Sequence, residues 1–228
     1  MSSRITIQIV IRLLAAVIVM SAAFFGSAGT FKWPEAWLYM ILQFSFSAAL
    51  SAWLKKYNPD LLKQRMTFFK RSAKAWDKVI MLICAAVLVP YLVLPGLDAV
   101  RYHWSNVLLP LKAVSFAGIL GSFALIFWVM RENPYLCRVV EIQKERGHRA
   151  ITTGPYRYVR HPMYVGVIIL FVCIPLALGS LWALIPAVVL TGLIIVRTQL
   201  EDKMLRAELQ GYKAYAEKVR HRLIPGIW

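Results

Sequence analysis

An uncharged run of 34 residues, 163–196, constrains the fold of this chain more than any other feature. About 20 apolar residues cross the hydrocarbon layer of a membrane as a helix, so the run is too long for one crossing. Gly179 and Ser180 lie near its middle and favour a turn. The run therefore predicts a hairpin of two helices, each of about 16 residues and about 24 Å. Local thinning of the membrane, or extension of the helices into the basic flanks, would cover the remaining thickness.

Four further apolar runs precede the hairpin, at residues 13–31, 36–54, 79–97 and 113–130. The first begins after Arg12 and is long for a signal peptide, so we interpret it as a retained helix. Only 17% of the residues are charged, whereas a soluble domain has about a quarter. We therefore expect an all-α fold, a polytopic membrane helix bundle with about six transmembrane helices and a C-terminal helical hairpin.

The basic residues lie mostly between the apolar runs, in segments that alternate along the chain. Of the 27 Lys and Arg residues, 24 lie before the first run or in residues 55–78, 131–160 and 197–228. Because basic loops stay on the cytoplasmic side, these segments and both termini are predicted to be cytoplasmic, which requires an even number of crossings. The net charge of +16 is then explained by loops that can also contact anionic lipid headgroups, and it does not indicate a nucleic-acid partner.

The sequence indicates no metal centre and no disulfide framework. Cys84, Cys137 and Cys173 are far apart and form no CxxC pair, and the four histidines show no HExxH spacing. The chain also has no GxGxxG fingerprint and no Walker-type phosphate loop.

Residues 148–166 form a loop of unusual composition before the hairpin. Gly154 and Pro155 favour a turn, and Pro162 suits the first position of the following helix. His161 would then lie at a helix N-terminus, where unpaired backbone N–H groups attract anions. Arginines add positive charge there, and tyrosines add flat aromatic faces, so the loop could hold a carboxylate and stack a purine. The alternative is an interfacial collar, because such residues are common at membrane boundaries.

A second polar segment follows the hairpin. Arg197 and Glu201 are four residues apart, so on a continuing helix they share one face. The hairpin would bring Glu201 and Asp202 opposite the basic, aromatic loop, and charges at a bilayer edge are functional candidates. The alternative is a solvated helix end in which the two charges neutralise each other. The tail that follows mixes aromatic and basic residues, and we interpret it as packing beneath the lipid headgroups.

Taken in order, these residues resemble the isoprenylcysteine carboxyl methyltransferase and phospholipid methyltransferase superfamily, in its bacterial type. The similar positions, within residues 131–225, are His148, Gly154, Tyr156, Arg160, His161, Pro162, Tyr164, Gly166, Arg197, Glu201, Asp202, Tyr212 and Tyr215. Members typically carry two adjacent glutamates where this chain has Glu201 and Asp202. A weaker similarity covers residues 58–65 and 76–78, for which no role is predicted.

The resemblance implies a multi-pass enzyme of the bacterial inner membrane, with S-adenosyl-L-methionine as cofactor in a cytoplasm-facing pocket. Residues 1–130 would supply the N-terminal membrane helices and a basic cytoplasmic loop, and residues 131–228 the cofactor-binding region. The implied partners are the lipid bilayer and an amphiphilic small-molecule substrate. The implied catalytic residues are Arg197 and Glu201. The implied cofactor-binding residues are His148, Gly154, Tyr156, Arg160, His161, Pro162, Tyr164, Gly166, Glu201, Asp202 and Tyr215.

The substrate is expected to be lipid-like or prenylated, with O-methylation of a prenylcysteine carboxylate as the first hypothesis. The residues themselves do not choose between acceptors, and a phospholipid amine is the alternative. A guanidinium group grips carboxylates with two hydrogen bonds, so Arg197 would suit a prenylcysteine carboxylate. Glu201 would suit a phospholipid amine, as a base or charge partner. Sterol-type reductases resemble the same superfamily but use NADPH and are generally longer than 228 residues. A transporter is a third class, but the inverted repeats typical of transporters are not found.

Overall fold

The computed structural model describes residues 2–66, 74–137 and 139–228, and these residues form helices and loops without a strand. One short π-helical turn, η1 (Gly96–Arg101), extends α4, and two 3-10 turns, η2 (Lys144–Arg146) and η3 (Gly154–Arg157), lie between α5 and α6. The α-helices of the described residues are α1 (Ser2–Ala28), α2 (Pro34–Tyr57), α3 (Pro59–Met66), α4 (Ala75–Pro95), α5 (Leu109–Glu132), α6 (Pro162–Ala177), α7 (Leu184–Glu208) and α8 (Tyr212–Lys218). The predicted all-α polytopic bundle is confirmed.

Five stretches of the described chain are long and apolar enough to cross a membrane. They are Ile5–Ala28, Pro34–Tyr57, Ala75–Arg101, Leu109–Glu132 and Leu184–Glu208. The remaining predicted crossing is the first helix of the hairpin, α6, which is apolar but has only 16 residues.

The predicted hairpin forms between α6 and α7. Its turn contains Gly179, whose φ of +87° is a conformation that favours glycine. The predicted length of about 16 residues is right for α6 and wrong for α7, which has 25 residues. The extra length follows from residues 197–208, which are mostly good helix formers and contain neither Gly nor Pro. This extension carries Arg197, Glu201 and Asp202 beyond the apolar run on a continuous helix.

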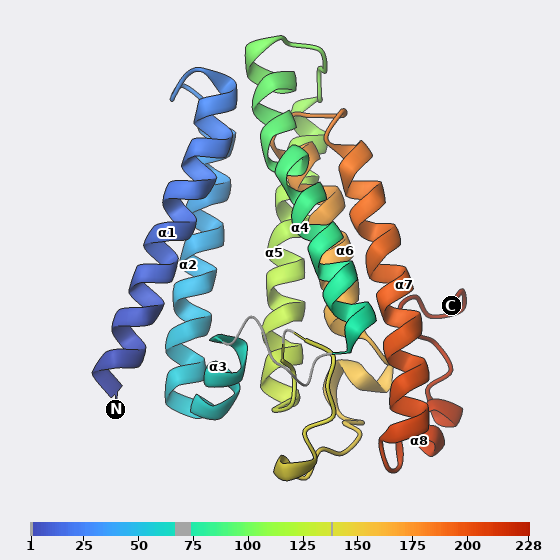
Figure 1. Ribbon diagram of the computed structural model, residues 1–228. Coiled ribbons are helices and arrows are strands. Elements are labelled where there is room, and N and C mark those ends of the chain that lie inside the picture. Colours follow the sequence, from blue (N-terminus) through green and yellow to red (C-terminus); the bar gives the residue numbers. More distant parts are fainter. Residues whose placement is uncertain (1, 67–73, 138) are drawn as a thin grey trace.

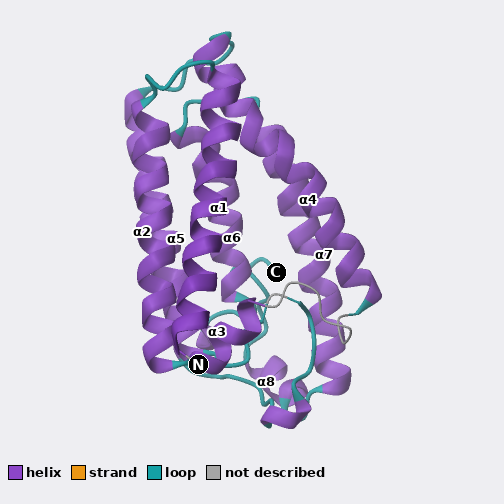
Figure 2. Cartoon of the chain, turned by 60° about the vertical axis from the view of Figure 1, so that its left-hand side comes forward, coloured by secondary structure: helices purple, strands orange, loops and turns teal. Residues whose placement is uncertain are grey.

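The long helices run side by side between two ends of the bundle (Figure 1). The N-terminus, α3 and α8 lie together at one end, which is the lower end in both Figure 1 and Figure 2. The end of α5, the start of α6 and the end of α7 lie at this end too. The basic segments predicted to share one side of a membrane are therefore at one end of the molecule. Residues 67–73 and 138 of these segments lie outside the described residues.

The core of the bundle holds the start of α6 firmly against α5. On α5, Ser122 Oγ donates a hydrogen bond of 2.7 Å to the carbonyl oxygen of Gly166 on α6. A Cβ atom at Gly166 would lie 2.9 Å from Cγ1 of Ile126, so the two helices are close-packed at this glycine. The core of the bundle also contains a cluster of buried apolar side chains that includes Phe24, Ile119 and Leu190. Packing thus fixes the helix start that carries His161 and Pro162.

Candidate active site

His161 and Pro162 begin α6 at the end of the bundle where the basic segments meet. His161 is the N-cap residue and Pro162 occupies the first helical position, as predicted from the sequence. Both residues are buried. Because α6 and α7 form an antiparallel hairpin, the start of α6 lies beside the extended end of α7. The loop and the carboxylates of Glu201 and Asp202 therefore face each other, through the contacts described next.

Asp202 of α7 is the centre of a buried ionic cluster. Its side chain is 1% exposed, and Arg160 grips it with two hydrogen bonds, Nε to Oδ1 at 2.7 Å and Nη2 to Oδ2 at 3.0 Å. Tyr212 donates to Oδ1 at 2.9 Å, and His161 Nε2 lies 3.4 Å from the same oxygen. Arg206 and Arg222 each donate Nε to Oδ2 at 3.1 Å. Both carboxylate oxygens are thus already occupied by the chain, and the predicted contact of Asp202 with a cofactor stays a prediction without structural support.

The C-terminal tail is tied to the start of α6 through its backbone. The backbone N–H groups of Arg160 and His161 donate to the carbonyl oxygens of His221 and Arg222, at 3.0 and 2.9 Å. Nη1 of Arg160 donates to the carbonyl oxygens of Val219 and Arg220, at 2.7 and 2.8 Å. The sequence suggested only that the tail packs beneath lipid headgroups, because backbone pairing leaves no side-chain pattern. In the structure, the tail helps to hold the residues that precede α6.

Tyr164 connects the two predicted catalytic residues. Its hydroxyl donates a short hydrogen bond to Oε2 of Glu201, and the guanidinium carbon of Arg197 lies 5.6 Å from the centre of its ring. The ring of His161 stacks with the ring of Tyr164, at 5.8 Å between centroids and 15° between planes. Arg197 and Glu201 therefore meet around one aromatic ring and do not neutralise each other as an isolated pair. Glu201 and Tyr164 are both half-buried.

Asp77, at the start of α4, is the partner of Arg197 that the sequence did not identify. Its side chain is fully buried and accepts Nε of Arg197 at 2.8 Å and Nη2 at 3.3 Å. It also accepts the backbone N–H of Val140 at 2.8 Å. The sequence did contain a signal for this pairing. Asp77 lies two residues before the apolar run 79–97, and a carboxylate at a membrane boundary is costly in free energy unless it is paired. The weak similarity at residues 76–78 thus includes Asp77, the buried residue that holds α4 to Arg197 of α7.

Two further tyrosines, Tyr156 and Tyr215, stabilise the loop that precedes α6 through hydrogen bonds. Tyr215 donates to the carbonyl oxygen of Tyr156 at 2.7 Å, and Asn133 donates to the Tyr156 hydroxyl at 2.7 Å. Burial raises the pKa of Tyr156, so its hydroxyl stays protonated. Gly154 has a φ of +57°, and a Cβ atom there would lie 2.5 Å from Cγ of Glu132. Gly154, Tyr156 and Tyr215 therefore shape the loop, and a contact of any of them with a cofactor stays a prediction.

His148 lies in a different environment from His161. Its ring stacks on Tyr135 at 4.5 Å, and its Nδ1 lies 3.4 Å from the backbone N–H of Gln143. Burial, together with the charge of Arg146, lowers the pKa of His148. Within the described residues, His148 makes no hydrogen bond or ring contact with Asp202 or Tyr164. It is linked to Tyr156 indirectly, through Tyr135 and Asn133.

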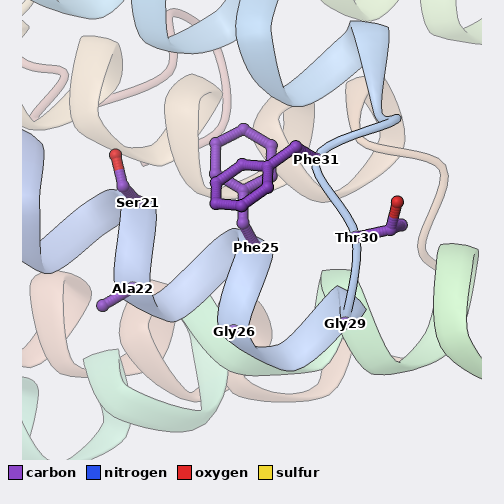
Figure 3. Close-up of a pocket in the computed structure, with 7 residues that line it drawn as sticks. All are labelled: Ser21, Ala22, Phe25, Gly26, Gly29, Thr30 and Phe31. Carbon is purple, nitrogen blue, oxygen red and sulfur yellow. The ribbon is translucent and has the colours of Figure 1, made fainter.

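Two hollows on the described surface lie away from this cluster. One, of about 470 Å³, is beside the end of α1, where the rings of Phe25 and Phe31 lie close together (Figure 3). The other, of about 390 Å³, is lined by aromatic and aliphatic residues of α2 and α5, including Trp53 and Phe127. Both are apolar and open and have no charged residue in their lining. Neither offers groups for acid, base or ionic chemistry, so the cluster around Tyr164 is the stronger candidate.

The arrangement around Tyr164 can bind a small zwitterion. Oε1 of Glu201 has no donor among the described residues, so this half-buried carboxylate can accept from a cationic group. The N-terminus of α6 offers the positive end of its helix dipole to an anion, while the backbone N–H groups of His161 and Tyr164 already donate to the carbonyl oxygens of Arg222 and His161. Tyr164 offers an aromatic face. These groups fit the amine, carboxylate and adenine of S-adenosylmethionine.

Residues 111–210 match a family model described as phospholipid methyltransferase. The match covers α5 from its third residue, all of α6 and α7, and every predicted site residue except Tyr215. It confirms the predicted resemblance to the superfamily for this part of the chain and indicates a methyltransferase. A search of curated proteins found no match.

Proposed function

We propose, from the match of residues 111–210 to the phospholipid methyltransferase family, that this protein is an integral membrane methyltransferase that uses S-adenosylmethionine. Its substrate would be lipid-like, with the reacting group at the end of the bundle where α6 begins. The observation that carries the proposal is the meeting of His161, Tyr164, Arg197 and Glu201 at one helix start, beside the basic segments. A polar cofactor would enter from the aqueous side, and the lipid from the bilayer.

Each part of the cofactor has a partner in the proposed site. The cationic amine would bind Glu201, and the carboxylate would bind the N-terminus of α6 beside His161. The adenine would lie against tyrosine faces, with Tyr164 as the central one. When bound, the sulfonium group supplies the methyl group for transfer. The chain then acts mainly by aligning the acceptor with the methyl carbon and by excluding water, since methyl transfer is an in-line displacement.

An amine is the acceptor that the site favours over a carboxylate. Nε and Nη2 of Arg197 are directed at Asp77, so a prenylcysteine carboxylate would compete with a buried carboxylate for the same guanidinium group. A phospholipid amine needs no group of Arg197, and Glu201, although it also faces the amine of the cofactor in this proposal, can accept the proton that the phospholipid amine loses. We therefore rank N-methylation of a phospholipid amine above O-methylation of a prenylcysteine.

The acceptor is tested with a methyl-labelled donor. Purified enzyme in lipid nanodiscs is given labelled S-adenosylmethionine and either phosphatidylethanolamine or a farnesylcysteine analogue. The expected result is label in the phospholipid headgroup, and the control is Glu201→Gln in the same nanodiscs. Label in the prenylcysteine alone would reverse the ranking and keep the methyltransferase. If neither substrate nor a total lipid extract is labelled, the proposed activity is wrong.

Arg197→Lys tests whether the guanidinium group does more than balance charge. Lysine keeps the charge but cannot bridge both oxygens of Asp77 while lying under the Tyr164 ring. We expect kcat to fall by about 10- to 100-fold through misplacement of Glu201 and the acceptor, with nearly unchanged affinity for S-adenosylhomocysteine. The measurement is steady-state kinetics together with calorimetric binding. Near-normal turnover in this variant would reduce Arg197 to a neutralising partner of Asp77.

The bundle is proposed to cross the inner membrane six times, with both termini cytoplasmic. α6 is about 24 Å long at 1.5 Å per residue, shorter than the membrane core of about 30 Å, and would cross where the bilayer is thinned. Single cysteines at Asn58, Glu145 and Gln210, in a chain lacking Cys84, Cys137 and Cys173, test this arrangement. All three are expected to react only after the cells are permeabilised. Labelling of any one from outside intact cells would refute the topology.

A further inference from the structure

Three guanidinium groups converge on the single carboxylate of Asp202. Arg160 and Asp202 are each 1% exposed, and together they form a complete buried pair. Arg206 and Arg222 add two more positive charges, with side chains that are 41% and 28% exposed. Three positive charges thus face one negative charge, and the cluster carries an excess of two.

The two outer arginines are held in a common orientation. Each donates its Nε to the same oxygen, Oδ2 of Asp202, at 3.1 Å. Their Nε atoms therefore lie no farther apart than twice that distance. The ring of Trp228 lies 4.8 Å from the guanidinium carbon of Arg222 and supports it. Because Nε is the anchored atom in both groups, the Nη atoms remain for another acceptor, and no acceptor among the described residues contacts them.

The neighbouring carboxylates of α7 are already engaged elsewhere. Glu201 accepts from Tyr164 on the Arg197 side, and Glu208 pairs with Lys74 at 2.9 Å. The tail next to Arg222 adds more positive charge through Arg220 and Lys218. Among the described residues, Arg206 and Arg222 thus share Asp202 as their carboxylate side-chain partner, and the terminal oxygen of Trp228 accepts the backbone N–H of Arg222. Like charges so close together repel each other unless an anion balances them.

We infer that Arg206 and Arg222 form a binding site for a phosphate-type oxyanion at the end of α7. Two guanidinium groups with outward Nη atoms match the geometry of phosphate oxygens. The ligand would be a phosphate ester of an anionic lipid headgroup or a free phosphate, since both carry the same oxygens. An anion here would hold Arg222 on Asp202 and so stabilise the pairing of the tail with Arg160 and His161. The inference requires no methyl transfer and is independent of the proposed function.

Thermal unfolding in neutral detergent, without any methyl donor, tests this site. Inorganic phosphate is titrated against chloride at constant ionic strength, and the midpoint of wild-type protein is expected to rise with phosphate concentration. In Arg206→Gln with Arg222→Gln, the apparent Kd for phosphate is expected to increase at least about tenfold. Lys144→Gln with Arg149→Gln removes two exposed charges from the loop before α6 and is the matched control, which should behave as wild type.

Nanodiscs separate the two sources of the ligand. If the ligand is a lipid headgroup, phosphatidylglycerol stabilises wild type relative to phosphatidylcholine without added phosphate, and the double variant loses this effect. If the ligand is free phosphate, only the titration shows the effect. Should the double variant fail to fold, Arg206→Gln alone is used, because it leaves the tail contacts of Arg222 in place. The inference is overturned if neither phosphate nor phosphatidylglycerol stabilises wild type, or if the control variant loses the effect equally.

Discussion

Asp202→Ala is expected to lower the free energy of unfolding by about 3–5 kcal/mol, which is large against the stability of most proteins. The cost arises because Arg160, at 1% exposure, would remain as a buried charge without a carboxylate partner. Tyr212 would also lose its acceptor, and the tail would lose the contact made by Arg222. The measurement is unfolding in detergent followed by circular dichroism.

Asp202→Glu and Asp60→Ala are the controls for this prediction. Glutamate keeps the charge and should retain most of the stability, with a loss from its extra methylene. Asp60 is 69% exposed and pairs only at the surface with Lys63, so its removal should cost less than about 1 kcal/mol. If Asp202→Ala and Asp60→Ala unfold at similar temperatures, the buried cluster does not hold this end of the bundle.

Glu201→Gln is expected to reduce turnover by at least about 100-fold while leaving the fold nearly intact. Glutamine keeps the size of the side chain and can still accept from Tyr164, but it loses the charge that would bind an amine. If Glu201 binds the amine of the cofactor, the Kd for S-adenosylhomocysteine rises. If Glu201 accepts a proton from the substrate, kcat falls and that Kd stays the same.

The control for Glu201→Gln is Glu217→Gln on α8. Glu217 is exposed, and the same chemical change there should leave turnover within about twofold, as is usual for surface substitutions. Turnover and calorimetric binding are measured on both variants. Normal turnover in Glu201→Gln would remove Glu201 from the catalytic residues.

Much of the helical arrangement could be predicted from the sequence, because apolar run length directly reports membrane-spanning helices. The runs at 36–54, 79–97 and 113–130 each lie within a described helix or its π-helical extension, the run at 13–31 extends three residues past the end of α1, and the turn of the hairpin contains Gly179. The end of α7 was underestimated because charge was taken as the boundary. A helix leaving a membrane continues through charged residues when these are good helix formers.

The site was predictable in its local features and not in its tertiary contacts. Pro162 at a helix start follows from local backbone rules, and the facing of Asp202 and Arg160 follows from the hairpin. The pairing of Arg197 with Asp77 joins residues 120 positions apart, and such contacts leave no periodic pattern. For the same reason, Arg222 and the backbone of the tail were not assigned to the site. The structure therefore divides the adjacent carboxylates into an open one, Glu201, and one enclosed by its own chain, Asp202.

Binding of S-adenosylhomocysteine to the purified protein tests the central claim most directly. Calorimetry on wild type is predicted to show saturable binding of S-adenosylhomocysteine and none of NADPH. His161→Ala and Tyr164→Ala should each weaken this binding at least about tenfold while the protein stays folded, since both flank the proposed cofactor position. In Tyr102→Ala, which changes an exposed tyrosine in the loop between η1 and α5, binding should be as in wild type. Binding of NADPH instead, or unchanged affinity in both site variants, would contradict the account.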